Sequence, residues 1–332
     1  MLNILKTLIN AVSVSGAEED VSEAIKSMIT DCCDEVYNDA LGNLIAVKKS
    51  GNFDAKKIMM AAHMDEIGFM VTFIEDNGFV RVAPVGGINW VAVAYGEILF
   101  RNGLRGILVP ENKVSSSEYN TTKMYVDIGA KNKADALKKI KVGDTCTLAP
   151  KLIKLMGNRI AVTKLDNKIA CVVLIQALLD LKNIKVKNDL YFVFTTQEEV
   201  GLRGARTSSQ AIMPDYAIAV DVTGTGDTPE ANPMVCKLGG GAAIKIMDSS
   251  VICHREMINL MMKTAESKKI AHQSEILLGG GTDTANMQAA GAGSIAGAIS
   301  IPSRYIHSGV ESCDMKDVQA CVDLLKETIK AI

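Results

Sequence analysis

The sequence lacks several features that would assign the protein to particular classes. No apolar run within its 332 residues approaches the length that spans a membrane. The first 25 residues have no basic head followed by an unbroken apolar core and a cleavage site. The net charge is only −2, and no basic stripe stands out. We therefore expect neither a nucleic-acid partner nor a membrane partner.

The cysteines do not form a recognisable disulfide or zinc pattern. All eight are scattered along the chain, and none belongs to a C-x-x-C pair. With 48% hydrophobic residues the chain can build a large core, so the cysteines are expected to be reduced thiols within it. These observations predict a cytoplasmic protein.

The pattern of apolar residues changes twice along the chain. Helical spacing over residues 1–12 and 16–30 is followed by two predicted strands with a turn around Gly51-Asn52. From about 69 to 159, short β-like runs are separated by Gly, Asn and Ser clusters. From 162 onward, predicted helices and strands alternate, which favours an α/β fold with a mixed, largely parallel sheet. We predict one α/β domain from residues 1–68 and 160–332, with a β-rich domain inserted at 69–159.

Acids and histidines follow the apolar strands of the predicted sheet. Sites in open α/β sheets form at the carboxyl ends of strands, so these residues are the candidates for chemistry. They are His63, Asp65 and Glu66 after IMMAA; Glu198 and Glu199 after YFVFTTQ; Asp221 in YAIAVDVT; His307 after ISIPSRYI; and Asp166, which stands just before a predicted helix.

Histidine and carboxylate donors together are the ligand set of Zn²⁺, Co²⁺ or Mn²⁺. A two-metal hydrolase site needs about this many donors, because one carboxylate bridges two ions roughly 3.5–4 Å apart. Each residue alone has a structural alternative: a strand-end histidine commonly makes one hydrogen bond, and Asp166 could cap its helix. The combination favours cations, because several acids beyond buried strands would otherwise repel one another.

Two further stretches are less informative. The glycine-rich run LGGGTDTAN at 278–286 lacks the Lys-Ser/Thr of a phosphate loop, so it predicts a turn into a helix that borders the pocket. The remaining histidines, His254 and His272, lie in or beside predicted helices and are expected to be structural.

The motifs resemble those of the glutamyl aminopeptidase / cellulase M family. The stretches AAHMDEIGFMV, LDNKIACVVLIQAL, FTTQEEVGLRGA, AVDVTGTGD, GGGTDTANMQ and IPSRYIHSGVES have the order and spacing of that family, and the resemblance covers essentially the whole chain. Members are dinuclear metallo-aminopeptidases, many of which build tetrahedral twelve-subunit shells. The resemblance implies an aminopeptidase-type α/β sandwich, and an inserted β-barrel-like, PDZ-like domain that pairs subunits.

The resemblance also implies a role for each candidate residue. His63 and Asp221 would bind one divalent ion, Glu199 and His307 the other, and Asp166 would bridge the two. Asp65 would orient His63, and Glu198 would be the general base. The ions would be Zn²⁺ or Co²⁺, with Mn²⁺ as an alternative, and the substrates would be peptides with a free N-terminus. The protein would be a homo-oligomer, built from dimers up to a tetrahedral dodecamer.

Adjacent residues of an extended chain point in opposite directions, so Glu198 and Glu199 are expected to do different work.

One stretch departs from the family pattern. Where the family usually has Asp-Asp-Arg-x-Gly, this chain has Asp166-Asn167-Lys168-Ile169-Ala170. The bridging aspartate is kept, and Asn167 can still adopt the cis peptide that related enzymes commonly have there. The change keeps open the alternative of a catalytically weakened shell protein. A second alternative is a glycosidase, which needs two facing carboxyl groups but neither His63 nor His307.

Overall fold

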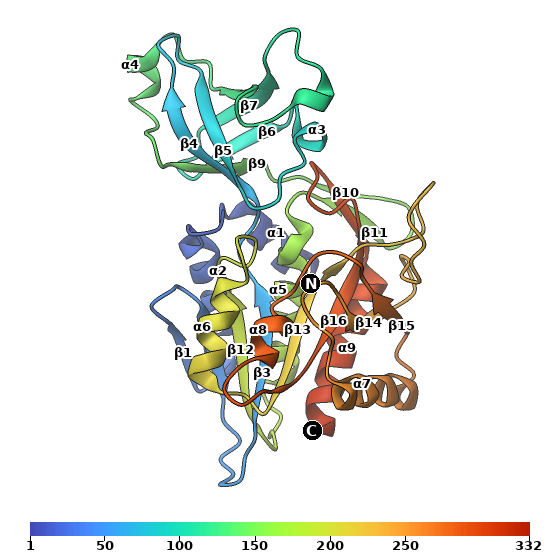
Figure 1. The fold of residues 1–332 in the computed structure, drawn as a ribbon. Helices are drawn as coiled ribbons and strands as arrows, with labels where there is room; N and C mark the ends of the chain where they lie inside the picture. Colours follow the sequence, from blue (N-terminus) through green and yellow to red (C-terminus); the bar gives the residue numbers. More distant parts are fainter.

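A large mixed sheet lies at the centre of the computed structural model, which describes residues 1–332 (Figure 1). This sheet has eleven strands, and nine of them form one continuous path. In spatial order these are β1 (Glu35–Asn38), β2 (Leu44–Lys48), β12 (Asp189–Thr195), β3 (Lys57–His63), β13 (Tyr216–Thr223), β16 (Ile295–Arg304), β17 (Glu311–Asp314), β11 (Arg159–Val162) and β10 (Leu152–Lys154). A branch adds β14 (Ala242–Met247), which pairs with β16 and with β15 (His272–Ile276).

The centre of the sheet is parallel and its flanks are antiparallel. Strands β12, β3, β13 and β16 run in the same direction, so their carboxyl ends meet at one edge. On either side, β2 pairs antiparallel with β12, and β17 pairs antiparallel with β16. The α/β class predicted from the sequence is confirmed, with the parallel pairing concentrated where the candidate residues lie.

The two strands predicted around the Gly51-Asn52 turn exist, but they do not pair with each other. Strand β12 lies between β2 and β3 and pairs with both. Its residues Leu190, Phe192, Val193 and Phe194 are all buried, and this two-sided burial is satisfied in the interior of the sheet. The chain therefore makes a longer connection from β2 to β3 instead of a hairpin.

Helices cover both faces of the sheet. One layer contains α1 (Leu2–Asn10), α2 (Glu19–Ile29), α5 (Leu165–Leu181), α7 (Arg255–Lys268) and α9 (Met315–Ala331). The opposite face carries α6 (Arg203–Ile212) and α8 (Thr284–Gln288). Alternation along β3 explains how one strand serves both layers: Ile58 and Met60 belong to the core with α5, whereas Met59 and Ala61 belong to the core with α6 and α8.

Helix α5 is almost entirely buried. It packs against β3 and β13 on one side and against α1, α2 and α9 on the others. An apolar surface all around a helix is stable only in such surroundings, which accounts for the continuous run from Ile169 to Ile175. The first turn of α5 therefore reaches the edge of the sheet next to the ends of β3 and β13.

A closed antiparallel barrel stands at one end of the α/β domain, at the top of Figure 1. It has its own apolar core, and closure removes the free strand edges that an open sheet would expose. Its strands are β4 (Gly68–Ile74), β5 (Val80–Val85), β8 (Met124–Asp127), β7 (Arg105–Pro110), β6 (Glu97–Phe100) and β9 (Thr145–Leu148), and it carries the short helices α3 (Trp90–Val93) and α4 (Lys133–Ala136). The last barrel strand, β9, ends at Leu148. The next strand along the chain, β10, pairs with β11 and so belongs to the large sheet.

An ion-pair cluster joins the barrel to the α/β domain. The guanidinium of Arg101, which follows β6, donates to the carboxylates of Asp20 and Glu19 at the start of α2. None of the helices in the chain combines the length and the apolar character that crossing a bilayer would require.

Candidate metal centre

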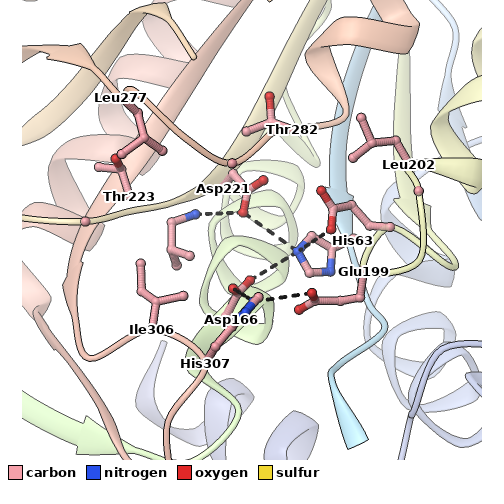
Figure 2. A pocket seen from close by; sticks show the side chains of 16 residues that line it. His63, Asp166, Glu199, Leu202, Asp221, Thr223, Leu277, Thr282, Ile306 and His307 are labelled. Carbon is pink, nitrogen blue, oxygen red and sulfur yellow. Dashed lines mark hydrogen bonds and ion pairs between the residues drawn. The ribbon is translucent and has the colours of Figure 1, made fainter. Parts of the chain in front are cut away.

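The predicted residues of the site meet at the carboxyl edge of the parallel strands, around a cavity of about 350 Å³ (Figure 2). His63 ends β3, Asp221 lies near the end of β13, and Asp166 comes from the first turn of α5. Glu198, Glu199 and His307 follow β12 and β16 in loops. All six line the cavity, whereas Asp65 and Glu66 are buried behind it.

Asp166 lies between the two histidines. Its Oδ1 is 3.1 Å from Nε2 of His63, and its Oδ2 is 3.3 Å from Nε2 of His307. The remaining donors are distributed around these rings: Oδ1 of Asp221 is 3.8 Å from Nε2 of His63, and Oε2 of Glu199 is 3.3 Å from Nε2 of His307. Each half of the site therefore contains one histidine and at least one carboxylate of its own, with Asp166 common to both.

Asp65 connects His63 to the glutamate pair. One of its carboxylate oxygens lies 3.4 Å from Nδ1 of His63, on the side of the ring that faces away from Asp166. Its two oxygens also accept hydrogen bonds from the backbone N–H groups of Glu198, at 3.0 Å, and Glu199, at 3.2 Å. The hydroxyl of Ser15 donates a further bond at 2.6 Å. Asp65 thus fixes the ring of His63 and the backbone of Glu198 and Glu199.

Glu198 and Glu199 face different histidines. Oε2 of Glu198 is 3.8 Å from Nε2 of His63, whereas Oε2 of Glu199 is 3.3 Å from Nε2 of His307. The preceding residue, Gln197, has φ of 52°, in the left-handed region that non-glycine residues rarely adopt. The strand has therefore ended before the pair, and the two carboxylates reach into different halves of the site.

The structure adds Glu311, which the sequence analysis did not identify. Its carboxylate is buried and accepts backbone N–H bonds from Asp166 and from His307, both at 2.8 Å. One side chain at the start of β17 therefore holds the backbone of two candidate ligands. Its only trace in the sequence is an acid four residues after His307, a spacing that identifies no role by itself.

A buried group of two lysines and one glutamate lies beneath the site. The sequence singled out Glu66 as an acid after β3, but not its pairing with Lys164 and Lys168. Lys164 and Lys168 approach Oε1 and Oε2 of Glu66 at 3.2 and 3.5 Å. Lys168 also donates to the carbonyl oxygen of Met64, between His63 and Asp65, and to the hydroxyl of Ser13. Lys168, one of three residues that depart from the family pattern, therefore connects α5 to the end of β3 by buried hydrogen bonds.

The peptide bond between Asp166 and Asn167 is cis, as expected for this family. The amide of Asn167 donates to the carbonyl oxygen of Val220 at 3.1 Å, directly before Asp221. Asn167 is fully buried, and its amide links the start of α5 to β13.

The glycine-rich run forms the predicted turn into a helix. Gly280, Gly281 and Thr282 line the cavity just before α8. His254 precedes α7 and accepts a hydrogen bond from the backbone N–H of Glu256, and His272 lies in β15; neither lines the cavity.

Without a cation, the charges of the site perturb one another strongly. Burial raises the pKa of Glu198 and of Asp221 well above the ordinary values, and neighbouring acids add to both rises. Hydrogen bonds to Asp166 and Glu199 raise the pKa of His307 to about 11. Burial alone would raise the pKa of Asp166. Hydrogen bonds with His307 and His63 outweigh this effect and hold the pKa below the ordinary range. The buried acids therefore need bound protons or bound cations.

The donor set fits divalent cations. Oδ1 of Asp166 and Oε1 of Glu199 are buried without a hydrogen-bond partner, although buried polar atoms normally have one. His63, Asp166 and Glu199 offer atoms close enough to share one ion, and so do His63, Glu198 and Asp221. Imidazole and carboxylate donors suit Zn²⁺, Co²⁺ and Mn²⁺.

A mixed α/β sheet with such donors at its parallel strand ends defines a metal-dependent hydrolase. The chain belongs to the M42 glutamyl aminopeptidase family, whose model matches residues 42–324. It is 47% identical over 330 residues to a protein of Acetivibrio thermocellus that is provisionally named an aminopeptidase, with 99% of this chain and 98% of the relative covered. The protein is thus a metallo-aminopeptidase.

Solved structures agree with this assignment. An aminopeptidase from the archaeon Desulfurococcus kamchatkensis superposes with a TM-score of 0.93 at 35% identity, covering 99% of this chain and 94% of its own. The TET1 peptidase of Pyrococcus horikoshii gives 0.88 at 32% identity, with 98% of each chain covered. That peptidase is described as assembling into a tetrahedron or a large octahedral shell.

Proposed function

We propose that the protein removes N-terminal residues from peptides at a site for two divalent ions. His63 and Asp221 would hold one ion, Glu199 and His307 would hold the other, and Asp166 would be shared by both. The observation that carries this proposal is the position of Asp166, whose two oxygens lie 3.1 and 3.3 Å from different histidines. The ions would be Zn²⁺ or Co²⁺, with Mn²⁺ as the alternative. When bound, they would polarise the scissile carbonyl and lower the pKa of a water molecule.

Glu198 is the general base in this proposal. It takes a proton from the attacking water and passes it to the leaving amine. Its carboxylate lines the cavity and faces His63, with Oε2 at 3.8 Å from Nε2 of that ring. Asp65 keeps Glu198 in place through the backbone N–H group, and orients His63 through Nδ1. Neither action requires Asp65 to touch the substrate.

Removal and replacement of metal test the proposal directly. The protein stripped with a chelator should lose hydrolysis of aminoacyl-anilides, and Zn²⁺, Co²⁺ or Mn²⁺ added singly should restore it. Elemental analysis of the restored protein should give two ions per chain. Full activity of a protein shown to be metal-free would refute the proposal, and one ion per chain in the active protein would refute the bridging role of Asp166.

The barrel is proposed to pair subunits, as the start of a tetrahedral dodecamer. It exposes large apolar side chains, among them Phe73, Tyr95 and Ile107, each at least half accessible. The shells described for the Pyrococcus horikoshii relative support the larger assembly. Light scattering should report a twelve-subunit mass, and a monomer at micromolar concentration would contradict the proposal.

A cytoplasmic location is proposed with it. All the cysteines are free thiols and all but Cys33 are buried, which suits a reducing compartment.

A further inference from the structure

Apart from the two histidines assigned to the metal ions, the walls of the cavity carry no cationic side chain. Neither Lys nor Arg occurs among the sixteen residues that line it. Its charged members are the candidate metal ligands and Glu198, and the polar side chains outside this set are the hydroxyls of Thr223 and Thr282. The apolar members are Leu202, Val222, Leu277 and Ile306.

The apolar side chains that line the cavity lie on two sides of the donor cluster. Figure 2 shows Leu277 and Ile306 on one side of Asp221, with His63 on the other. Leu202 lies toward the His63 side of the same view. A peptide whose scissile bond lies at the donors would therefore bring its first side chain against an apolar wall.

The cations on neighbouring segments are already engaged. Arg203 follows Leu202, but its guanidinium donates to the side chain of Gln197. Arg304 lies two residues before Ile306, and Asp227 accepts two of its N–H groups, at 3.0 and 2.7 Å.

The buried lysine of β14 is also engaged. The ammonium group of Lys245 lies between Glu275 and Asp248, and all three side chains are fully buried. Lys245 and Arg304 are thus paired with carboxylates, and Arg203, bonded to Gln197, does not line the cavity. None of the three lies in the wall to receive the carboxylate of an N-terminal glutamate or aspartate.

An N-terminal lysine would also lack a partner in the outer part of the cavity. The carboxylates that line it are the candidate ligands, which the cations would hold, and Glu198, which the proposed function assigns to the attacking water. Asp227, on the Arg304 side, is already paired with that arginine. Either charge would lose hydration on binding without gaining an ion pair.

We propose that the enzyme prefers peptides whose N-terminal residue is a neutral aliphatic one such as leucine, over both acidic and basic residues. The proposal rests on the function assigned above, because it assumes that the peptide binds at the donor cluster. The wall formed by Leu277, Val222 and Ile306 receives the aliphatic side chain, and burial of that apolar surface provides the selectivity.

Leucyl-, glutamyl- and lysyl-anilides, assayed with the metal-loaded full chain, test the preference. We expect kcat/KM for the leucyl substrate to exceed the other two by about 100-fold, in the range that apolar pockets achieve. Glutamyl or lysyl turnover equal to or faster than leucyl turnover would overturn the proposal. Hydrolysis of none of the three would overturn the proposed function itself, so the two failures are distinguishable.

A pair of variants locates the selectivity at the wall. Leu277 lines the cavity, whereas its neighbour Leu278 is 87% exposed and does not line it. Leu277→Arg should lower the ratio of leucyl to glutamyl kcat/KM by at least about tenfold, because it places a cation against the bound side chain. Leu278→Arg makes the same change in charge one residue away and should leave the ratio unaltered. If Leu277→Arg and Leu278→Arg, both with unchanged metal content, had the same ratio of leucyl to glutamyl kcat/KM, Leu277 would not contact the bound side chain and the proposed wall would be refuted.

Discussion

Replacement of each member of the Glu198–Glu199 pair by glutamine should produce two different defects. Glutamine keeps the size of the side chain and removes its charge. The backbone of both residues is held by the carboxylate of Asp65, so neither replacement should move the neighbouring side chain. Glu198→Gln should therefore keep both metal ions and lose turnover, whereas Glu199→Gln should lose metal.

The expected magnitudes follow from the positions of the two carboxylates. A general base contributes roughly 10²–10⁴-fold to the rate, or about 2.7–5.4 kcal/mol of activation free energy, so Glu198→Gln should lower kcat by that factor. Glu199 lies 3.3 Å from Nε2 of His307. Loss of its charge should weaken metal binding by at least about 10–100-fold, the cost of removing even an indirect ligand contact.

Two measurements on each purified variant separate the outcomes. Elemental analysis gives ions per chain, and leucyl-anilide hydrolysis at saturating metal gives kcat. Glu266→Gln, at an exposed position of α7, is the matched control and should change neither value.

The structure also permits a competing result. Glu198 lies within reach of an ion held by His63 and Asp221. Loss of metal from Glu198→Gln would make that residue a ligand, and more than a tenth of wild-type kcat would exclude it as the base.

Three further predictions concern the surroundings of the site. Glu311→Gln replaces one of two N–H acceptors by an amide NH₂, so metal affinity measured by calorimetry should fall about 10–100-fold; unchanged affinity would exclude a positioning role. Lys168→Met removes one of the two cations paired with Glu66 and the hydrogen-bond donor to the Met64 carbonyl. The free energy of unfolding, measured in urea, should fall by roughly 3–5 kcal/mol. Lys168→Arg should retain more stability, and equal losses would contradict the charge argument. The third prediction concerns pH. Burial raises the pKa of Glu311 to about 8, and hydrogen bonds to Asp166 and Glu199 raise that of His307 to about 11. The metal-free native state then holds more protons than the unfolded chain above about pH 4.3, so its unfolding free energy should fall as pH rises toward those values. Because metal displaces these protons, the increase in Tm on adding metal should be larger at pH 8 than at pH 6; an equal increase would refute this linkage.

The local part of the fold can be predicted from the sequence. Strands and helices have short apolar periods, and a polar residue after a buried run marks the end of a strand. This pattern alone places four of the candidate residues at strand ends: His63, Glu198, Asp221 and His307. Because parallel strands end at the same edge, their convergence follows from the fold class.

Pairings between distant segments could not be predicted in the same way. The insertion of β12 between β2 and β3 depends on burial of β12 from both sides, which the spacing of residues within each strand does not record. The family pattern indicated that Asp65 orients His63. Its bonds to the backbone of both glutamates join residues more than 130 positions apart, and they became visible only in the folded chain.

The sequence by itself determined which chemical groups stand at the strand ends, and its motifs determined the family. Tertiary structure alone decided what holds those groups: Glu311 across the backbone of Asp166 and His307, and Lys168 against Glu66 and Met64. The physical reason is that an acid or a lysine has the same local signal whether it is solvated or buried. Its role is fixed only when folding removes water and leaves particular hydrogen-bond partners within reach.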